Sequence, residues 1–191
     1  MMAKTHIAFA TTLLFIPIVI SPQIAHLFST DIILLPIIIL SLIVGSLFPD
    51  IDEPNSTISN KFFLAKPLSL SLKLFGLKHR GFTHKFIFFL IFLFIALLSF
   101  SLVDKNISIA LLFFSFGIFA HQLGDMMVGA GVHKGGIYNY FSPFYSSNST
   151  TKFLPFFMRC KINGIKEKLY LVVFSLFSFM GLYLTLVNAS I

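Results

Sequence analysis

The chain has 191 residues, of which 57% are hydrophobic and only 11% are charged. A soluble domain is about half apolar and about a quarter charged, so this composition excludes a soluble globular protein and indicates an integral membrane protein. The formal net charge of +7 does not require a nucleic-acid partner, because basic loops of membrane proteins set orientation and contact anionic lipid headgroups.

The chain contains apolar runs that are each long enough to cross a bilayer, which takes about 17 to 25 helical residues. They cover residues 3–20, 31–48, 86–103, 107–127 and 169–187. Pro17 and Pro22 limit the far end of the first run, and Pro36 predicts a kink in the second. We therefore expect one membrane-embedded domain, residues 1–191, of the all-α class with about five transmembrane helices.

Two long connectors lie between these runs. The first, residues 49–85, contains KFFLAKPLSLSLKLFGLK, in which lysines are spaced among apolar residues and Pro67 interrupts the pattern. Such a segment is expected to lie in the headgroup plane as an interfacial segment. The second connector ends at Lys168, and its part 129–168 is rich in glycine, serine, asparagine, proline and aromatic residues. Connectors of this length are often lids or binding surfaces.

The basic residues are distributed unevenly over the chain. Of the 14 lysines and arginines, all but Lys105 lie at the start of the first run or in the two long connectors. Cytoplasmic loops of inner-membrane proteins carry the excess of lysine and arginine. The sequence therefore predicts a multi-pass protein of the inner (cytoplasmic) membrane, with its N-terminus and both long connectors in the cytoplasm and its C-terminus outside.

Side chains that can bind a metal gather at the cytoplasmic ends of the predicted helices under this topology. They are His6, Asp50, Asp52, His79, His84, His121 and Asp125. The topology was assigned from basic residues alone, so this grouping is an independent result. His26, Asp31 and Asp104 fall at the opposite face and are excluded. Structural residues scattered by chance have no reason to segregate in this way.

GIFAHQLGDMMVGAG places two of these residues at the end of the fourth run. His121 and Asp125 are four residues apart, so they lie one above the other on one face of a helix. An imidazole and a carboxylate stacked in this way can bind one metal ion. The alternative is a hydrogen-bonded pair with a structural role.

Two further motifs lie in the first long connector. In GSLFPDIDEPNS, Pro49 ends the second helix and an extended turn presents Asp50 and Asp52, so that both can reach one cation. In HRGFTH, a glycine between His79 and His84 suits a loop that bends back on a metal. The alternatives are an acidic turn that caps a following segment and two interfacial histidines.

Four histidines and three aspartates form a mixed nitrogen and oxygen donor set. This set favours zinc, with manganese or iron as alternatives, over calcium or a thiolate site. Seven ligands exceed the four of one tetrahedral site, so a centre with two ions is expected. Such centres stabilise both the attacking and the leaving oxygen of a displacement at phosphorus.

Three motifs of the chain resemble those of the YdjM-type inner-membrane metal-dependent hydrolases. They are PDID with a nearby serine, HRG-x-TH, and H-x-L-x-D followed by glycine and a later proline. The resemblance extends from Thr5-His6 through Gly131 and Pro143 to Glu167, which precedes the last predicted helix. The family is more remotely similar to zinc-dependent phospholipase C. The resemblance implies a helical membrane fold, hydrolase activity and a metal-binding role for the seven residues named above.

The chain departs from that pattern beside the proposed ligands and lacks the motifs of other membrane hydrolases. Lys85 stands where serine is expected, Glu53 where histidine is common and Val128 where threonine is usual. These departures bear on the substrate more than on the metal. HExxH and GxSxG are absent, and Ser115 occupies the position where a lipid phosphatase of the phosphatidic-acid type needs arginine. Cys160 has no evident catalytic partner and is expected to be inert.

The favoured hypothesis is a membrane-bound metal-dependent hydrolase that cleaves a phosphoester of a lipid-like substrate by metal-activated water at the cytoplasmic face. Asp50, Asp52 and Asp125 are the candidates for the general base, and Arg80 is the candidate for phosphate contact through its guanidinium. Membrane lipids are the expected partners. The alternatives are a metal-ion transporter or sensor and a membrane scaffold with a structural metal. Clustering at one face favours a site over an ion path.

Overall fold

The computed structural model describes residues 2–21, 34–61, 63, 65–74, 81–127, 140–141 and 159–189, and every regular element among them is a helix. The membrane-length helices are α1 (Ala3–Ile20), α3 (Leu34–Leu47) with its 3-10 continuation η1 (Phe48–Asp52), α7 (Lys105–Met126) and α9 (Ile165–Ala189). The apolar helix α6 (Phe86–Leu102) is shorter, with 17 residues. These helices confirm the predicted all-α membrane class.

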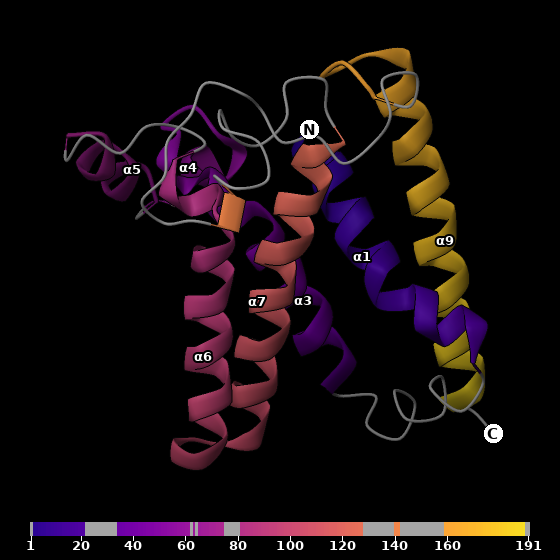
Figure 1. The fold of residues 1–191 in the computed structure, drawn as a ribbon. Helices are drawn as coiled ribbons and strands as arrows, with labels where there is room; N and C mark the ends of the chain where they lie inside the picture. The colour runs from indigo at the N-terminus through magenta and orange to yellow at the C-terminus, as the bar shows by residue number, and fades with distance from the viewer. Residues whose placement is uncertain are drawn as a thin grey trace.

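The long helices form an irregular row. Helix α9 packs on α1, α1 packs on α3 and α7, α3 packs on α7, and α7 packs on α6 (Figure 1). Short helices cover one end of this row: α4 (Thr57–Lys61), α5 (Ala65–Leu74) and η2 (Phe82–His84). The N-terminus lies at the same end and the C-terminus at the other (Figure 1). The short helices and the N-terminus therefore share one end of the bundle, which we call the N-terminal end.

The tightest contact in the row is the crossing of α3 over α7. A Cβ on Gly45 would overlap the carbonyl group of Phe114, and a Cβ on Gly117 would lie 2.7 Å from the backbone nitrogen of Ser46. Because neither glycine has a side chain, the two backbones touch. Small residues at such crossings are the usual means of close helix approach in membranes. This crossing brings the end of α3, and hence η1, against the last turns of α7.

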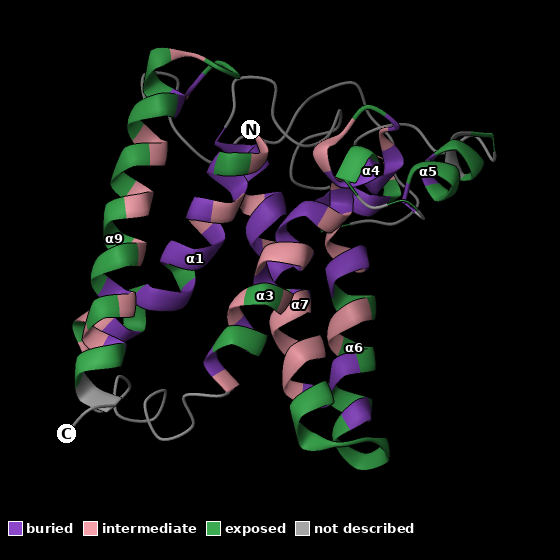
Figure 2. Cartoon of the chain, turned by 180° about the vertical axis from the view of Figure 1, so that it is seen from behind, coloured by how far each residue is buried: buried purple, intermediate pink, exposed green. Residues whose placement is uncertain are grey.

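Helix α9 is held to α1 by buried hydroxyl groups. Thr11 Oγ1 and Ser178 Oγ are 2.8 Å apart, and Thr12 Oγ1 donates to the backbone carbonyl of Phe174 at 2.8 Å. The rest of α9 is largely exposed, as Figure 2 shows by its green outer surface. Beyond the first turn, which carries the exposed Lys166 and Lys168, the exposed residues of α9 are almost all apolar, as expected of a helix that faces lipid on most of its circumference.

Three boundary predictions are corrected. Pro36 lies in the first turn of α3 as described, where a missing N–H interrupts little, so it does not kink that helix. Pro67 likewise lies in the first turn of α5 and does not interrupt it. Helix α9 begins at Ile165 rather than at residue 169, so Glu167 lies inside its first turn. An acidic residue is favourable there because helix N-termini carry a partial positive charge.

The buried carboxylate of Glu167 ties the start of α9 to the start of α1. Its Oε1 accepts the backbone N–H of Met2 and its Oε2 accepts that of Asn163, both at 2.6 Å. Glu167→Gln should lower the free energy of unfolding by about 1.5–3 kcal/mol, because an amide cannot accept both bonds and a hydrogen bond to a charged group contributes about that much. Denaturant titration followed by circular dichroism measures the loss. Glu53→Gln is the control and should change little, because the part-exposed carboxylate of Glu53 accepts a single hydrogen bond, from Asn55, among the described residues.

Candidate metal centre

Five of the predicted ligands converge at the N-terminal end of the bundle, where the short helices lie. His6 comes from the first turn of α1, Asp50 from η1, His84 from η2, and His121 and Asp125 from the end of α7. Four of them are almost fully buried, and Asp50 is 24% exposed. Residues from four separate elements therefore meet in one polar cluster, as their common membrane face predicted.

The first group within this cluster is a triangle of donor atoms. His84 Nε2 and His121 Nε2 are 3.2 Å apart, and Asp50 Oδ1 lies 3.7 Å from the first and 3.6 Å from the second. Donor atoms bound to one tetrahedral zinc are separated by about 3.3 Å, because each bond is about 2.0–2.1 Å long. The triangle thus has nearly the size of one face of a tetrahedral site, and Asp125 Oδ2 lies beside it, 3.5 Å from His84 Nε2.

The second group consists of His6, His121 and Asp125. His6 Nε2 lies 3.2 Å from Asp125 Oδ1, and Asp125 Oδ2 lies 3.8 Å from His121 Nε2. The rings of His6 and His121 are stacked, with centroids 3.9 Å apart. His6, which taken alone in the sequence carried little weight, is therefore fully integrated into the cluster.

His121 belongs to both groups, and this limits what they can hold. One imidazole nitrogen binds one metal ion, so the two triangles are not two independent sites. A second ion requires a further donor. The predicted ligand His79 lies outside the described residues, as do Arg80, Gly131 and Pro143. The described residues therefore supply three ligands for one ion, Asp50, His84 and His121, and two further ligands, His6 and Asp125, for a second ion.

Hydrogen bonds outside the cluster fix the proton on each inner imidazole. His121 Nδ1 lies 2.7 Å from the backbone carbonyl of Ser46, which can only accept, so Nδ1 carries the proton. Thr83 donates its single hydroxyl proton to Asp52 Oδ2 at 2.6 Å, so its oxygen accepts from His84 Nδ1 at 3.0 Å. In the neutral state, both Nε2 atoms therefore point lone pairs into the cluster. Outer partners of this kind orient histidine ligands in metal sites.

This arrangement fits a cation. Two imidazole lone pairs face each other at 3.2 Å, with carboxylate oxygens of Asp50 and Asp125 beside them. Acceptors that face one another in a buried site repel, and buried charges are otherwise paired or coordinate metals. His6 Nδ1 is also buried and has no hydrogen-bond partner among the described residues. Buried His and Asp groups that can hold a metal ion are thus present, as predicted.

The two aspartates of PDID do not point the same way. The sequence predicted an extended turn, but η1 is a 3-10 helix, because Pro49 is compatible with the start of a helix. Residues two apart on a 3-10 helix point in different directions, since each residue turns the chain by about 120°. Asp50 faces His84 Nε2, whereas Asp52 Oδ2 lies 3.7 Å from His84 Nδ1 on the outer side of that ring. We therefore assign Asp52 an orienting role.

A second polar network braces η2 against α7. Gln122 donates to the backbone carbonyls of Thr83 and Lys85, and the hydroxyl of Tyr140 donates to Gln122 Oε1 at 2.9 Å. Burial raises the pKa of Tyr140, so this hydroxyl keeps its proton and remains a donor. Sequence reasoning missed Thr83, Gln122 and Tyr140. For the first two, the available signal was a polar side chain next to a proposed histidine ligand.

Cys160 is a free, buried thiol whose pKa is raised by burial. A raised pKa disfavours the reactive thiolate, which agrees with the prediction that this residue is inert.

Replacing Thr83 tests the orienting contacts. Thr83→Val removes the hydroxyl that joins Asp52 to His84 while keeping the shape of the side chain. We expect zinc affinity to fall by about 10–100-fold, the usual effect of losing an outer partner of a metal ligand. Competition with a chromogenic chelator measures the affinity. Thr83→Ser keeps the hydroxyl and should retain most of it; equal affinities in both variants would contradict the assignment.

Comparison with known protein families assigns nearly the whole chain to one family. The family model described as YdjM inner membrane protein matches residues 1–189. No curated protein and no solved structure matches the chain significantly.

Proposed function

The chain belongs to the YdjM inner membrane protein family, and we propose that it is a membrane-bound metal-dependent hydrolase that cleaves a phosphoester of a lipid-like substrate at the cytoplasmic face. The observation that carries the proposal is the pair of imidazole lone pairs, on His84 and His121, that face each other beside Asp50. A buried set of acceptors with one open side needs a cation and leaves room for a reacting group.

The described residues have distinct roles in this proposal. His84, His121 and Asp50 would hold zinc, or manganese or iron, and Asp125 and His6 would hold a second ion together with a donor from elsewhere in the chain. When bound, such an ion supplies Lewis acidity that activates water and stabilises negative charge on an ester oxygen. The side chains hold this charge in a largely water-excluded site, where electrostatic interactions are stronger than in water.

Asp50 is the best candidate for the general base. It is the only one of the three candidate carboxylates with substantial solvent exposure, whereas Asp52 and Asp125 are buried. Its Oδ1 faces the two imidazoles, and its Oδ2 forms no hydrogen bond or ion pair with any other residue that the structure describes. Oδ2 is therefore placed to take a proton from an attacking water at the open side of the cluster.

The apolar core beneath the cluster supports hydrolysis over ion transport. Ala10 lies one turn after His6, and Ala120 precedes His121 in the chain. Both belong to a hydrophobic core that continues along α1 through Leu14 and Ile18. An ion path needs polar groups across the bilayer. Beneath the metal centre, the buried polar side chains of the described helices are hydroxyls, such as those of Thr11, Thr12 and Ser115. These hydroxyls donate to backbone carbonyls of their own helices, and none of them is ionisable.

A phosphodiesterase assay tests the proposal. The protein is purified in detergent, loaded with zinc or manganese, and incubated with bis(4-nitrophenyl) phosphate or with phosphatidylglycerol in mixed micelles. We expect metal-dependent hydrolysis that a chelator abolishes and that Asp50→Asn reduces by about 100-fold or more, since general bases contribute about 10²–10⁴-fold. Asp104→Asn, at the other end of α7, is the control. Stoichiometric metal without hydrolysis of either compound would favour a transport, sensor or structural role.

A further inference from the structure

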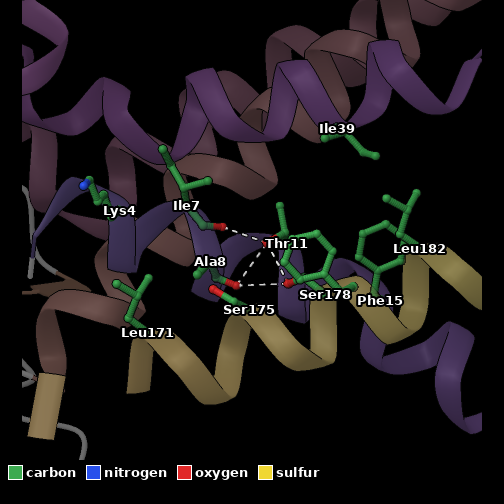
Figure 3. Close-up of a pocket in the computed structure, with 11 residues that line it drawn as sticks. Lys4, Ile7, Ala8, Thr11, Phe15, Ile39, Leu171, Ser175, Ser178 and Leu182 are labelled. Atoms are coloured by element: carbon green, nitrogen blue, oxygen red, sulfur yellow. Dashed lines mark hydrogen bonds between the residues drawn. The ribbon is translucent and has the colours of Figure 1, made fainter. Parts of the chain in front are cut away.

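A groove lies between α1, α3 and α9, and its lining does not include any of the metal-ligand candidates. Its volume is about 320 Å³, within the range of about 300–1,000 Å³ that ligand sites occupy. We call it the Lys4 groove. Its apolar lining includes Ile7 and Phe15 of α1, Ile39 of α3, and Leu171 and Leu182 of α9 (Figure 3). Phe179 of α9 also lines it.

The interior of the Lys4 groove suits a hydrocarbon chain. The hydroxyls of Thr11 and Ser178 lie in its floor, but they bond to each other and to backbone carbonyls, so they do not require a polar ligand. The remaining side chains are almost all apolar. Since α1 and α9 are membrane-length helices, the groove lies at the depth of the acyl chains of the bilayer.

One end of the groove carries positive charge. The ammonium of Lys4 lies at this end (Figure 3), is exposed, and forms no ion pair with any described residue. Lys168 is exposed and lies one turn before Leu171, on the same face of α9. Glu167 lies at the start of α9, but its buried carboxylate accepts two backbone N–H groups and forms no ion pair with Lys4 or Lys168.

We propose that the Lys4 groove binds an anionic phospholipid of the surrounding membrane, with one acyl chain between α1 and α9 and the phosphate beside Lys4 and Lys168. The occupant is inferred from charge complementarity at the mouth and from the apolar interior. Each basic residue near a membrane surface favours anionic lipid by about fivefold. The lipid also fills a seam in which α9 has few other partners among the described helices.

The absence of tryptophan from the chain makes this proposal testable by fluorescence. Phe179→Trp introduces one tryptophan at the rim of the groove, where Phe179 is 70% exposed and the larger ring fits. Phe94→Trp places the same probe on α6, which does not pack on α1 or α9 and where Phe94 is 63% exposed. Both proteins are reconstituted in phosphatidylcholine nanodiscs with increasing fractions of phosphatidylglycerol that carries brominated acyl chains.

The groove probe should be quenched at a mole fraction of brominated phosphatidylglycerol about fivefold or more below that needed with brominated phosphatidylcholine. The α6 probe should not distinguish the two lipids. Adding Lys4→Gln to the groove probe should remove most of the preference, whereas Lys105→Gln, at the other end of the bundle, should keep it. Unchanged zinc content in Lys4→Gln shows that the neighbouring metal centre is intact. Equal quenching by both lipids, or a preference that survives Lys4→Gln, would overturn the proposal.

Discussion

Replacing His121 by alanine is expected to remove bound metal from the protein more completely than any other single substitution. His121 is the one residue shared by both groups of donors, and its Nε2 lies within 3.2–3.8 Å of His84, Asp50 and Asp125. Its loss should lower zinc affinity by more than the about 10–100-fold that follows removal of an outer partner. Metal content after dialysis, measured by plasma mass spectrometry, gives the result.

His6→Ala is the informative comparison. It leaves the triangle of Asp50, His84 and His121 complete, so one metal ion per chain should remain. If the wild-type protein holds two ions, His6→Ala should lose one and His121→Ala at least one, with the remaining ion weakened. Asp104→Asn, whose carboxylate caps the far end of α7, should lose none. Wild-type metal content in His121→Ala would refute the metal centre and leave a hydrogen-bonded structural cluster.

Gly117→Ala is expected to destabilise the protein although alanine is the better helix former. A Cβ at this position would meet the backbone of α3, with the nitrogen of Ser46 2.7 Å away. Backbone atoms cannot rotate aside, so the helices must separate. Overpacking costs about 1–3 kcal/mol, which exceeds the gain of about 1 kcal/mol from replacing a helical glycine by alanine.

The same substitution should weaken metal binding at a distance. The backbone carbonyl of Ser46, in α3, accepts a hydrogen bond from His121 Nδ1, and η1, which carries Asp50, follows directly after α3. Separation of α3 from α7 should therefore displace both His121 and Asp50. Denaturant titration and chelator competition measure the two effects in one preparation. Gly164→Ala is the control, because its nearest contact is a looser 3.0 Å to the carbonyl of Lys161. Unchanged zinc affinity in a destabilised Gly117→Ala would show that the crossing supports the fold but not the centre.

The sequence alone determined the membrane class, the helices and the end of the bundle at which the polar residues gather. Hydropathy adds up along a contiguous segment, so each run could be recognised without its neighbours. Helix α1 begins and ends where predicted, and α6 and α7 match within two residues. His84, His121 and Asp125 could be grouped because each lies at a predicted helix end on one membrane face.

Tertiary structure decided which of these residues touch and how each points. His6 meets Asp125, 119 positions away in the numbering, only because α1 packs against α7. Asp50 and Asp52 point in different directions because η1 is a 3-10 helix. The imidazole tautomers follow from the carbonyl of Ser46 and the hydroxyl of Thr83, to which no role was assigned from the sequence. The groove beside Lys4 likewise needs two helices from opposite ends of the chain. Side-chain direction and long-range contact depend on the packing of several elements at once, so no local pattern in the sequence specifies them.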